Sequence, residues 1–221
     1  MSRDRSTIAA GTQAGATTER LPRGRHHLSR AQVEQSQRRR LLAAMAEALT
    51  EKGYVGTSVA DVLEGAGVSR QTFYQQFSSK LDCFMHAFDA AGDLLFARLD
   101  EAQRQAHGPP IERFERALGA YFDSLDDQPA LARVFLVEVY AAGPRALERR
   151  AALQGRIVRA MSDLLGARSD QARFACEVLV AGVGALVTGP LVTHDRDALR
   201  GLEDRVIDLV RLAVEARPVE P

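Results

Sequence analysis

Several residue types are scarce in this chain, and each scarcity narrows what the protein can be. There is no tryptophan, and the only two cysteines are Cys83 and Cys176. They lie far apart and have neither metal-ligand nor redox spacing, so a disulfide scaffold is not expected and a reducing cytoplasm is the predicted location. Residues 1–20 contain no apolar segment of the kind that a secretory signal needs.

Long hydrophobic runs are missing as well. The one segment that suggests a membrane is Val178–Thr193, which is uncharged but holds three glycines and a proline. A membrane-spanning helix needs about 20 predominantly apolar residues. The segment therefore predicts a buried helix, and no membrane partner is expected.

Strand patterns are also absent, because apolar residues recur at helical spacing almost throughout. Glycine and proline punctuate the second part of the chain where helices should end and begin. The expected long helices span 80–106, 111–126, 129–141, 145–166, 170–189 and 196–216. The predicted fold is all-α with about nine helices.

Charge is balanced overall but unevenly distributed. Residues 1–80 hold twelve Lys and Arg against seven Asp and Glu, whereas residues 81–221 hold seventeen against twenty-two. A basic front and an acidic rear are expected when only the front meets nucleic acid.

The front also carries the signals of a helix-turn-helix. Ser29 with Gln32, Ser58 with Asp61, and Ser79 with Asp82 have the spacing of capping boxes. A short helix closed by Gly67 and a second one opened by Ser69 follow the first helix, which is how such a unit is built. We therefore expect a three-helix DNA-binding domain over residues 29–78.

The segment Ala66–Lys80, "AGVSRQTFYQQFSSK", contains no acidic residue. Phe73 and Phe77 share one helical face and can anchor this helix to the core. The polar side chains then face solvent, where Arg can recognise guanine and Gln adenine. Helix N-termini near Ser58 and Ser79 can hold phosphate groups through free N–H donors, with Lys80 adding a full charge.

The stretch "TSVADVLEGAGVSRQTFYQQFSSKLDCF" resembles the signature of TetR-family transcriptional regulators. The resemblance covers roughly residues 29–84. It implies base readout by Arg70, Gln71 and Thr72. It implies phosphate contacts from Thr57 or Ser58, and from Ser69, Tyr74, Gln75, Gln76 and Lys80.

Residues 1–28 predict a flexible basic arm. Arg23 and Arg25 lie in "RLPRGRHHLSR", next to two histidines that lack ligand spacing. Such an arm can enter the minor groove beside the operator. A tail that gives only non-specific attraction is the alternative that the sequence leaves open.

Residues 79–221 predict a ligand-binding and dimerisation domain. By resemblance to the family, aromatic residues of its middle helices line a pocket for an apolar molecule; the candidates are Phe88, Phe114, Tyr121, Phe122, Phe135, Tyr140 and Met161. The last two helices are expected to pair two subunits; the candidates are Val178, Ala181, Gly182, Ala185, Leu202, Val206 and Leu209.

The sequence thus predicts a cytoplasmic, nucleoid-associated homodimer that binds a pseudo-palindromic DNA operator as a repressor and is released by a small-molecule effector. No cofactor is expected. A soft-metal site at Cys83 and His86 is the minor alternative, since only two ligands are local. An all-α enzyme with an unrecognised active site and an architectural DNA-binding protein without a sensor are the rival functions; no catalytic motif favours the enzyme.

Overall fold

The computed structural model describes residues 29–215 of the chain. In that range it contains nine α-helices, one 3₁₀ turn and no strand, as the sequence predicts. The elements are α1 (Arg30–Gly56), α2 (Val59–Ala66), α3 (Arg70–Gln76), α4 (Lys80–Gln105), α5 (Pro110–Asp127), α6 (Pro129–Leu136), η1 (Glu138–Tyr140), α7 (Pro144–Leu164), α8 (Asp170–Thr193) and α9 (Arg196–Glu215).

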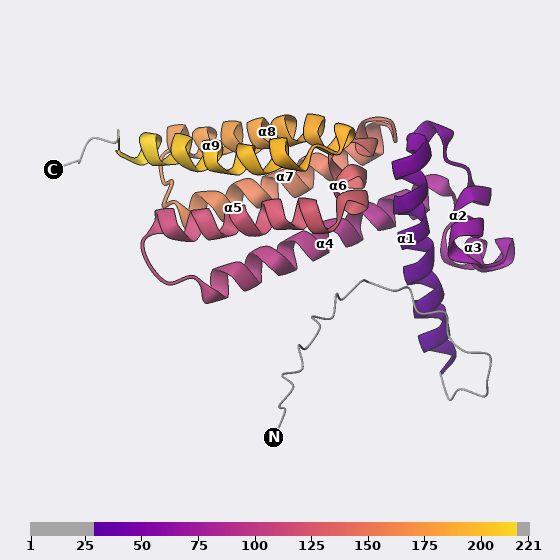
Figure 1. Ribbon diagram of the computed structural model, residues 1–221. Coiled ribbons are helices and arrows are strands. Elements are labelled where there is room, and N and C mark those ends of the chain that lie inside the picture. Colours follow the sequence, from indigo (N-terminus) through magenta and orange to yellow (C-terminus); the bar gives the residue numbers. More distant parts are fainter. Residues whose placement is uncertain (1–28, 216–221) are drawn as a thin grey trace, which may run out of the picture.

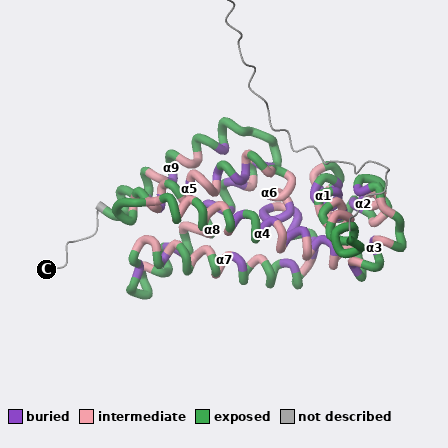
Figure 2. Tube along the Cα trace, turned by 90° about the horizontal axis from the view of Figure 1, so that it is seen from below, coloured by how far each residue is buried: buried purple, intermediate pink, exposed green. Residues whose placement is uncertain are grey.

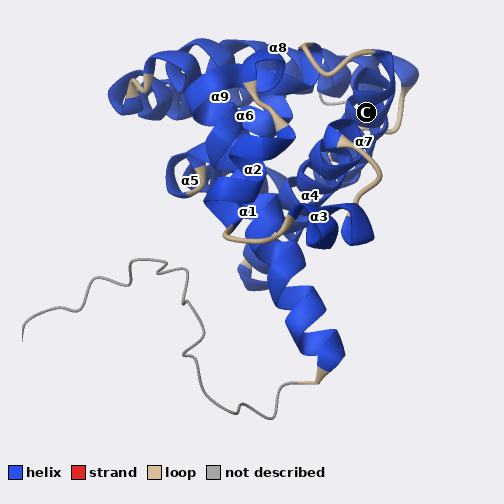
Figure 3. Cartoon of the chain, turned by 90° about the vertical axis from the view of Figure 1, so that its right-hand side faces the viewer, coloured by secondary structure: helices blue, strands red, loops and turns tan. Residues whose placement is uncertain are grey.

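The helices form a small head and a longer body (Figure 1). Helices α1, α2 and α3 make the head. Helix α1 lies crosswise to the body, and α2 packs against α1. Helix α4 leaves the head and runs the length of the body, where it packs mainly against α5 and α6. Helices α8 and α9 lie side by side on the edge of the body away from α4. Figure 3 shows the same arrangement from the head end.

Local sequence explains where most helices begin. The hydroxyls of Ser29, Ser58 and Ser69 each accept the N–H three residues later. Helices α5, α6 and α7 instead begin with proline, whose missing N–H costs nothing in the first turn. Ser79 also caps α4, but the carboxylate of Asp82 accepts from Ser78, so the expected third capping box is incomplete.

Two of the long helices differ from the sequence predictions, and α1 contains a break. Gly53 has a φ of 65° and interrupts α1, and a short helical segment continues to Gly56. Helix α8 runs past Pro190 to Thr193, because a proline near the C-terminus of a helix removes only one donor; it ends where His194 takes a left-handed conformation, with a φ of 55°. The helix expected over 129–141 divides at Val137 into α6 and η1.

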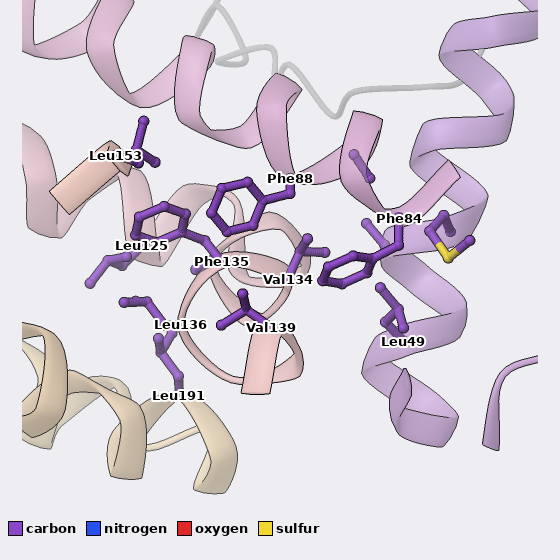
Figure 4. Close-up of a cluster of buried hydrophobic side chains, with 14 of the residues drawn as sticks. Leu49, Phe84, Phe88, Leu125, Val134, Phe135, Leu136, Val139, Leu153 and Leu191 are labelled. Carbon is purple, nitrogen blue, oxygen red and sulfur yellow. The ribbon is translucent and has the colours of Figure 1, made fainter. Parts of the chain in front are cut away.

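One buried apolar cluster extends from α1 through α4 and α6 to α8 and α9. Figure 4 shows Leu49 of α1 and Phe84 of α4 beside Val134 of α6, with Phe88 and Phe135 continuing into the body. The Phe88 and Phe135 rings stack with their centres 5.0 Å apart. Helix α6 is therefore the centre of the core and joins the head to the body.

Burial is uneven along the long helices. In Figure 2 buried residues gather where helices face one another, and exposed residues occupy the outer sides. Helix α8 is the exception to the predicted burial of the apolar segment. It is the one described helix long and apolar enough to span a membrane by composition, yet only 28% of that window is buried within the chain.

Candidate functional site

The segment expected to read DNA bases forms α3, and one face of this helix is buried while the other is exposed. Phe73 and Phe77 are buried, with exposed fractions of 0% and 1%, and their rings lie 5.6 Å apart. Arg70, Gln71 and Gln75 are exposed on the other side. Tyr74 is 49% exposed, and its ring meets the edge of Phe73 at 5.3 Å between centres. The helix therefore presents an uninterrupted polar stripe to solvent.

The remaining residues of α3 mainly fix its geometry. Ser69 accepts the N–H of Thr72 at 3.0 Å, and the two hydroxyls lie 2.9 Å apart. Gln76 donates from Nε2 to the carbonyl of Glu34 at 2.9 Å, which ties the end of α3 to α1. Arg38 of α1 lies over the Phe77 ring at 4.7 Å. The head thus holds the recognition stripe at two points.

The start of α2 is occupied by internal partners. The carboxylate of Asp61 accepts hydrogen bonds from the Lys52 ammonium and from the Ser58 N–H, the latter at 2.7 Å. These hydrogen bonds hold the pKa of Asp61 well below its usual range, and the one from Lys52 has the largest effect. Ser58 itself is exposed. Thr57 is only 2% exposed, and its hydroxyl donates to the carbonyls of Ala48 and Gly53. Ser58 is therefore accessible from solvent, whereas the hydroxyl of Thr57 is not.

Lys80 has a structural role that sequence reasoning missed. Its ammonium donates to the carbonyls of Tyr54 and Thr57 at 2.8 and 2.9 Å, and it lies 4.3 Å from the centre of the Tyr54 ring. Carbonyls left free at the end of α1 are satisfied in this way. This explains a lysine in the first turn of α4, where the helix dipole does not favour one.

Glu138 holds the same turn from the other side. It is 6% exposed, accepts the Tyr54 N–H at 2.8 Å, and is paired with Arg133 of α6 at 3.1 Å. Two residues before it, Leu136 lines a cavity in the body. The turn at Tyr54 is therefore clamped between α4 and η1, and η1 directly follows a cavity-lining helix.

The cavity has a volume of about 330 Å³ and lies between the distal half of α4 and helices α5, α6, α7, α8 and α9. Four of the expected pocket residues line it, namely Phe114, Tyr121, Phe135 and Met161. Phe88 and Phe122 pack in the core outside the lining. Tyr140 is 57% exposed and also lies outside. The other lining residues carry no local sequence signal. Most of them are aliphatic, and the polar ones include Arg150 and Gln154.

An exposed apolar surface covers the outer side of α8 and the adjoining end of α9. Phe174, Val178 and Leu186 of α8 have exposed fractions of 63%, 54% and 55%, and Ala181, Gly182 and Ala185 lie exposed between them. On α9, Leu209 and Leu212 are 57% and 66% exposed. Two residues expected at the subunit interface are not part of this exposed surface. Val206 is 5% exposed and lines the cavity, and Leu202 is half-buried.

Cys83 and His86 do not share an open metal site. Cys83 is fully buried, whereas His86 lies near Asp82, 3.8 Å from its carboxylate, with its ring against Phe77. Within residues 29–215 no group of three or more His, Cys, Asp or Glu side chains is placed to hold a metal ion. Arg23 and Arg25 of the expected minor-groove arm lie outside the described residues.

The buried thiols give a direct check of this packing. Burial raises the pKa of Cys83 to about 12, and Cys176 is also buried. We expect neither thiol to react with a disulfide reagent in the native protein at pH 8, because reaction requires an exposed thiolate. Both should react once guanidinium chloride unfolds the chain. One rapidly reacting thiol in the native protein would show that this part of the core is wrongly placed.

The chain has the arrangement of a helix-turn-helix transcriptional regulator, with an exposed helix on the head and a helical body that encloses a cavity. Residues 41–87 match the model of the bacterial regulatory proteins of the tetR family. Over these residues the chain is similar to that family.

Relatives and solved structures agree with this assignment. Two relatives come from Mycolicibacterium smegmatis. The chain is 29% identical to the transcriptional regulator EthR over 157 residues, covering 71% of this chain and 70% of EthR, and 23% identical to the transcriptional activator FasR over 168 residues, covering 76% of each. The fold matches the regulator FadR of Bacillus subtilis, solved in complex with stearoyl-CoA, with a TM-score of 0.67 and 18% identity over 77% of this chain and 96% of FadR. These relatives are regulators, which argues against the all-α enzyme.

Proposed function

We propose that the protein is a homodimeric repressor that binds a pseudo-palindromic operator and is released from it by a small, largely apolar ligand. The observation that carries the DNA-binding part is the polar stripe of α3, which faces solvent on the side opposite Phe73 and Phe77. In a helix-turn-helix, this face of the second helix enters the major groove.

The structure refines the roles proposed for the DNA-contacting residues. Arg70, Gln71 and Thr72 are proposed to contact base edges. Phosphate contacts are assigned to exposed groups, namely Ser58, Ser69, Tyr74 and Gln75. Thr57, Gln76 and Lys80 are proposed to support recognition by fixing the head, because their polar atoms bind carbonyl groups of the chain. Arg23 and Arg25 remain proposed minor-groove contacts.

Two features support the dimer and the sensor. A surface as apolar as the outer side of α8 is rare on a monomer, and in an operator-binding dimer it pairs two reading heads. A cavity of about 330 Å³ is within the size range of small-molecule sites. Stearoyl-CoA in the B. subtilis FadR shows that a long apolar chain can occupy a protein with this fold.

The proposed response passes through the clamp on Tyr54. A ligand that displaces Phe135 or Leu136 shifts η1, and with it the Glu138 carboxylate that holds the Tyr54 N–H. Lys80 connects the same turn to α4, which also lines the cavity through Phe96. The ligand releases DNA only if it binds the state with displaced heads more tightly than the DNA-bound state.

Selection of bound duplexes from a random DNA library tests the DNA-binding part. We expect the wild type to enrich one inverted repeat. Arg70→Ala should lose preference at one position in each half-site, by about 1–3 kcal/mol, because a bidentate contact to a base is removed.

Arg39→Ala is the matched control, since it removes the same charge from an exposed position on α1. It should weaken binding equally for all sequences or not at all. If no sequence is enriched at low salt, the protein is not a sequence-specific regulator of this kind.

A further inference from the structure

Arg150 is a cation without a counter-ion that faces the ligand cavity. It lies in the first half of α7, where its Nη1 donates to the Gln154 amide oxygen at 3.0 Å and its guanidinium lies 5.0 Å from the centre of the Tyr140 ring. Its Nε is buried and has no hydrogen-bond partner. None of the ion pairs among residues 29–215 includes Arg150.

Apart from Gln154 and the phenols of Tyr140 and Tyr121, the surroundings of Arg150 are largely apolar. Leu179 and Val183 of α8 line the same cavity, and Gly184 lies beside one of the terminal nitrogens of Arg150. Tyr121 of α5 lines the cavity too. Burial raises the pKa of Tyr121, and the nearby charge of Arg150 opposes that shift. The Tyr121 phenol is therefore a neutral donor that lines the same cavity as the guanidinium.

The other charged groups of the cavity lie away from this cluster. Gln103 and Arg113 bind each other between α4 and α5, with the Gln103 amide donating to the Arg113 carbonyl at 3.2 Å. Asp100 and Asp163 are exposed. Asp163 follows Arg150 by thirteen residues on α7, which places them about 20 Å apart along the helix axis. The cavity is thus elongated, with a cationic end near α6 and a polar rim at the other end.

We propose that the effector is a carboxylate with an elongated apolar body, whose anionic group binds Arg150 and Tyr121. This rests on the proposed function, in which the cavity is the sensor. A neutral apolar ligand would remove water from the Arg150 guanidinium without supplying a counter-charge, and desolvating an unpaired charge costs free energy. A carboxylate supplies that charge and accepts from the terminal N–H groups of the guanidinium. Its apolar body then extends along α7 between Phe114 and Met161.

Titration calorimetry on the full chain tests this with decanoate and methyl decanoate, which share one chain and differ in charge. We expect decanoate to bind the wild type more tightly than the ester. Arg150→Met should weaken decanoate binding by about 10- to 100-fold, because charge-assisted hydrogen bonds are lost. It should change ester binding by less than about threefold. Arg150→Lys keeps the charge and should retain part of the preference for the carboxylate.

Arg159→Met is the matched control on the same helix. Arg159 is exposed and does not line the cavity, so both probes should bind this variant as they bind the wild type. Thermal melting without ligand establishes that each variant is folded.

Three results would overturn the proposal. The ester binds the wild type as tightly as decanoate, or Arg150→Met leaves decanoate binding unchanged, or neither probe binds. An enriched operator alongside any of these results leaves the DNA-binding function standing. Decanoyl-CoA binding that is insensitive to Arg150→Met, with no binding of free decanoate, would assign the cavity to a thioester instead.

Discussion

Glu138→Ala is expected to lower the free energy of unfolding by about 3–5 kcal/mol, the usual cost of removing one partner of a buried ion pair. The change leaves the guanidinium of Arg133 buried without its carboxylate, and it leaves the Tyr54 N–H without an acceptor. Arg133 already has one buried nitrogen without a partner, so the site cannot repair itself locally. Urea unfolding followed by circular dichroism measures the loss.

Two variants separate the ion pair from general effects. Glu138→Gln keeps the size of the side chain and an acceptor for Tyr54, so it should cost less than Glu138→Ala. Glu148→Ala removes an exposed carboxylate from α7 and should change stability by no more than about 0.5 kcal/mol. A Glu138→Ala protein as stable as the wild type would mean that the clamp on Tyr54 does not hold the head.

The second large effect is expected from Val178→Glu. Val178 is 54% exposed on the outer side of α8, so a carboxylate there leaves the fold of one chain intact but becomes buried if two copies pair. We expect the variant to be monomeric by sedimentation equilibrium. Its operator affinity should fall by at least about 100-fold, because linked half-site contacts gain about 10²–10⁴ over a single one.

Leu94→Glu is the matched control. Leu94 is 38% exposed on α4, away from the α8 and α9 surface, and the same charge there should leave the dimer unchanged. A Val178→Glu protein that remains dimeric would place the subunit interface elsewhere. Intact dimerisation with lost DNA binding would show that the change acts on the head.

The head could be predicted from sequence because its signals are local. The hydroxyls of Ser58 and Ser69 act within their own first turns, and the spacing of Phe73 and Phe77 alone decides which side of α3 faces solvent. Each signal involves residues fewer than five positions apart, so no knowledge of tertiary structure is needed.

Long-range contacts explain what the sequence did not reveal. Lys80 has the position of a phosphate-binding residue, but its carbonyl partners lie 26 and 23 residues earlier in the chain. Arg150 is one of twenty-seven arginines, and only the packing of α7 against α5 and α8 distinguishes it from a solvated one. Val206 belongs to the same apolar stripe as Leu209, and the contact of α9 with α5 decides which of them is buried.

The head and the body are expected to unfold as one cooperative unit. Leu49, Phe84 and Val134 belong to three different helices, yet they meet in one buried cluster, so the head cannot open without exposing the core of the body (Figure 4). A ligand that binds the folded body stabilises the whole unit by mass action. Filling the cavity should therefore raise the melting temperature of the DNA-reading helices, although the ligand touches none of them.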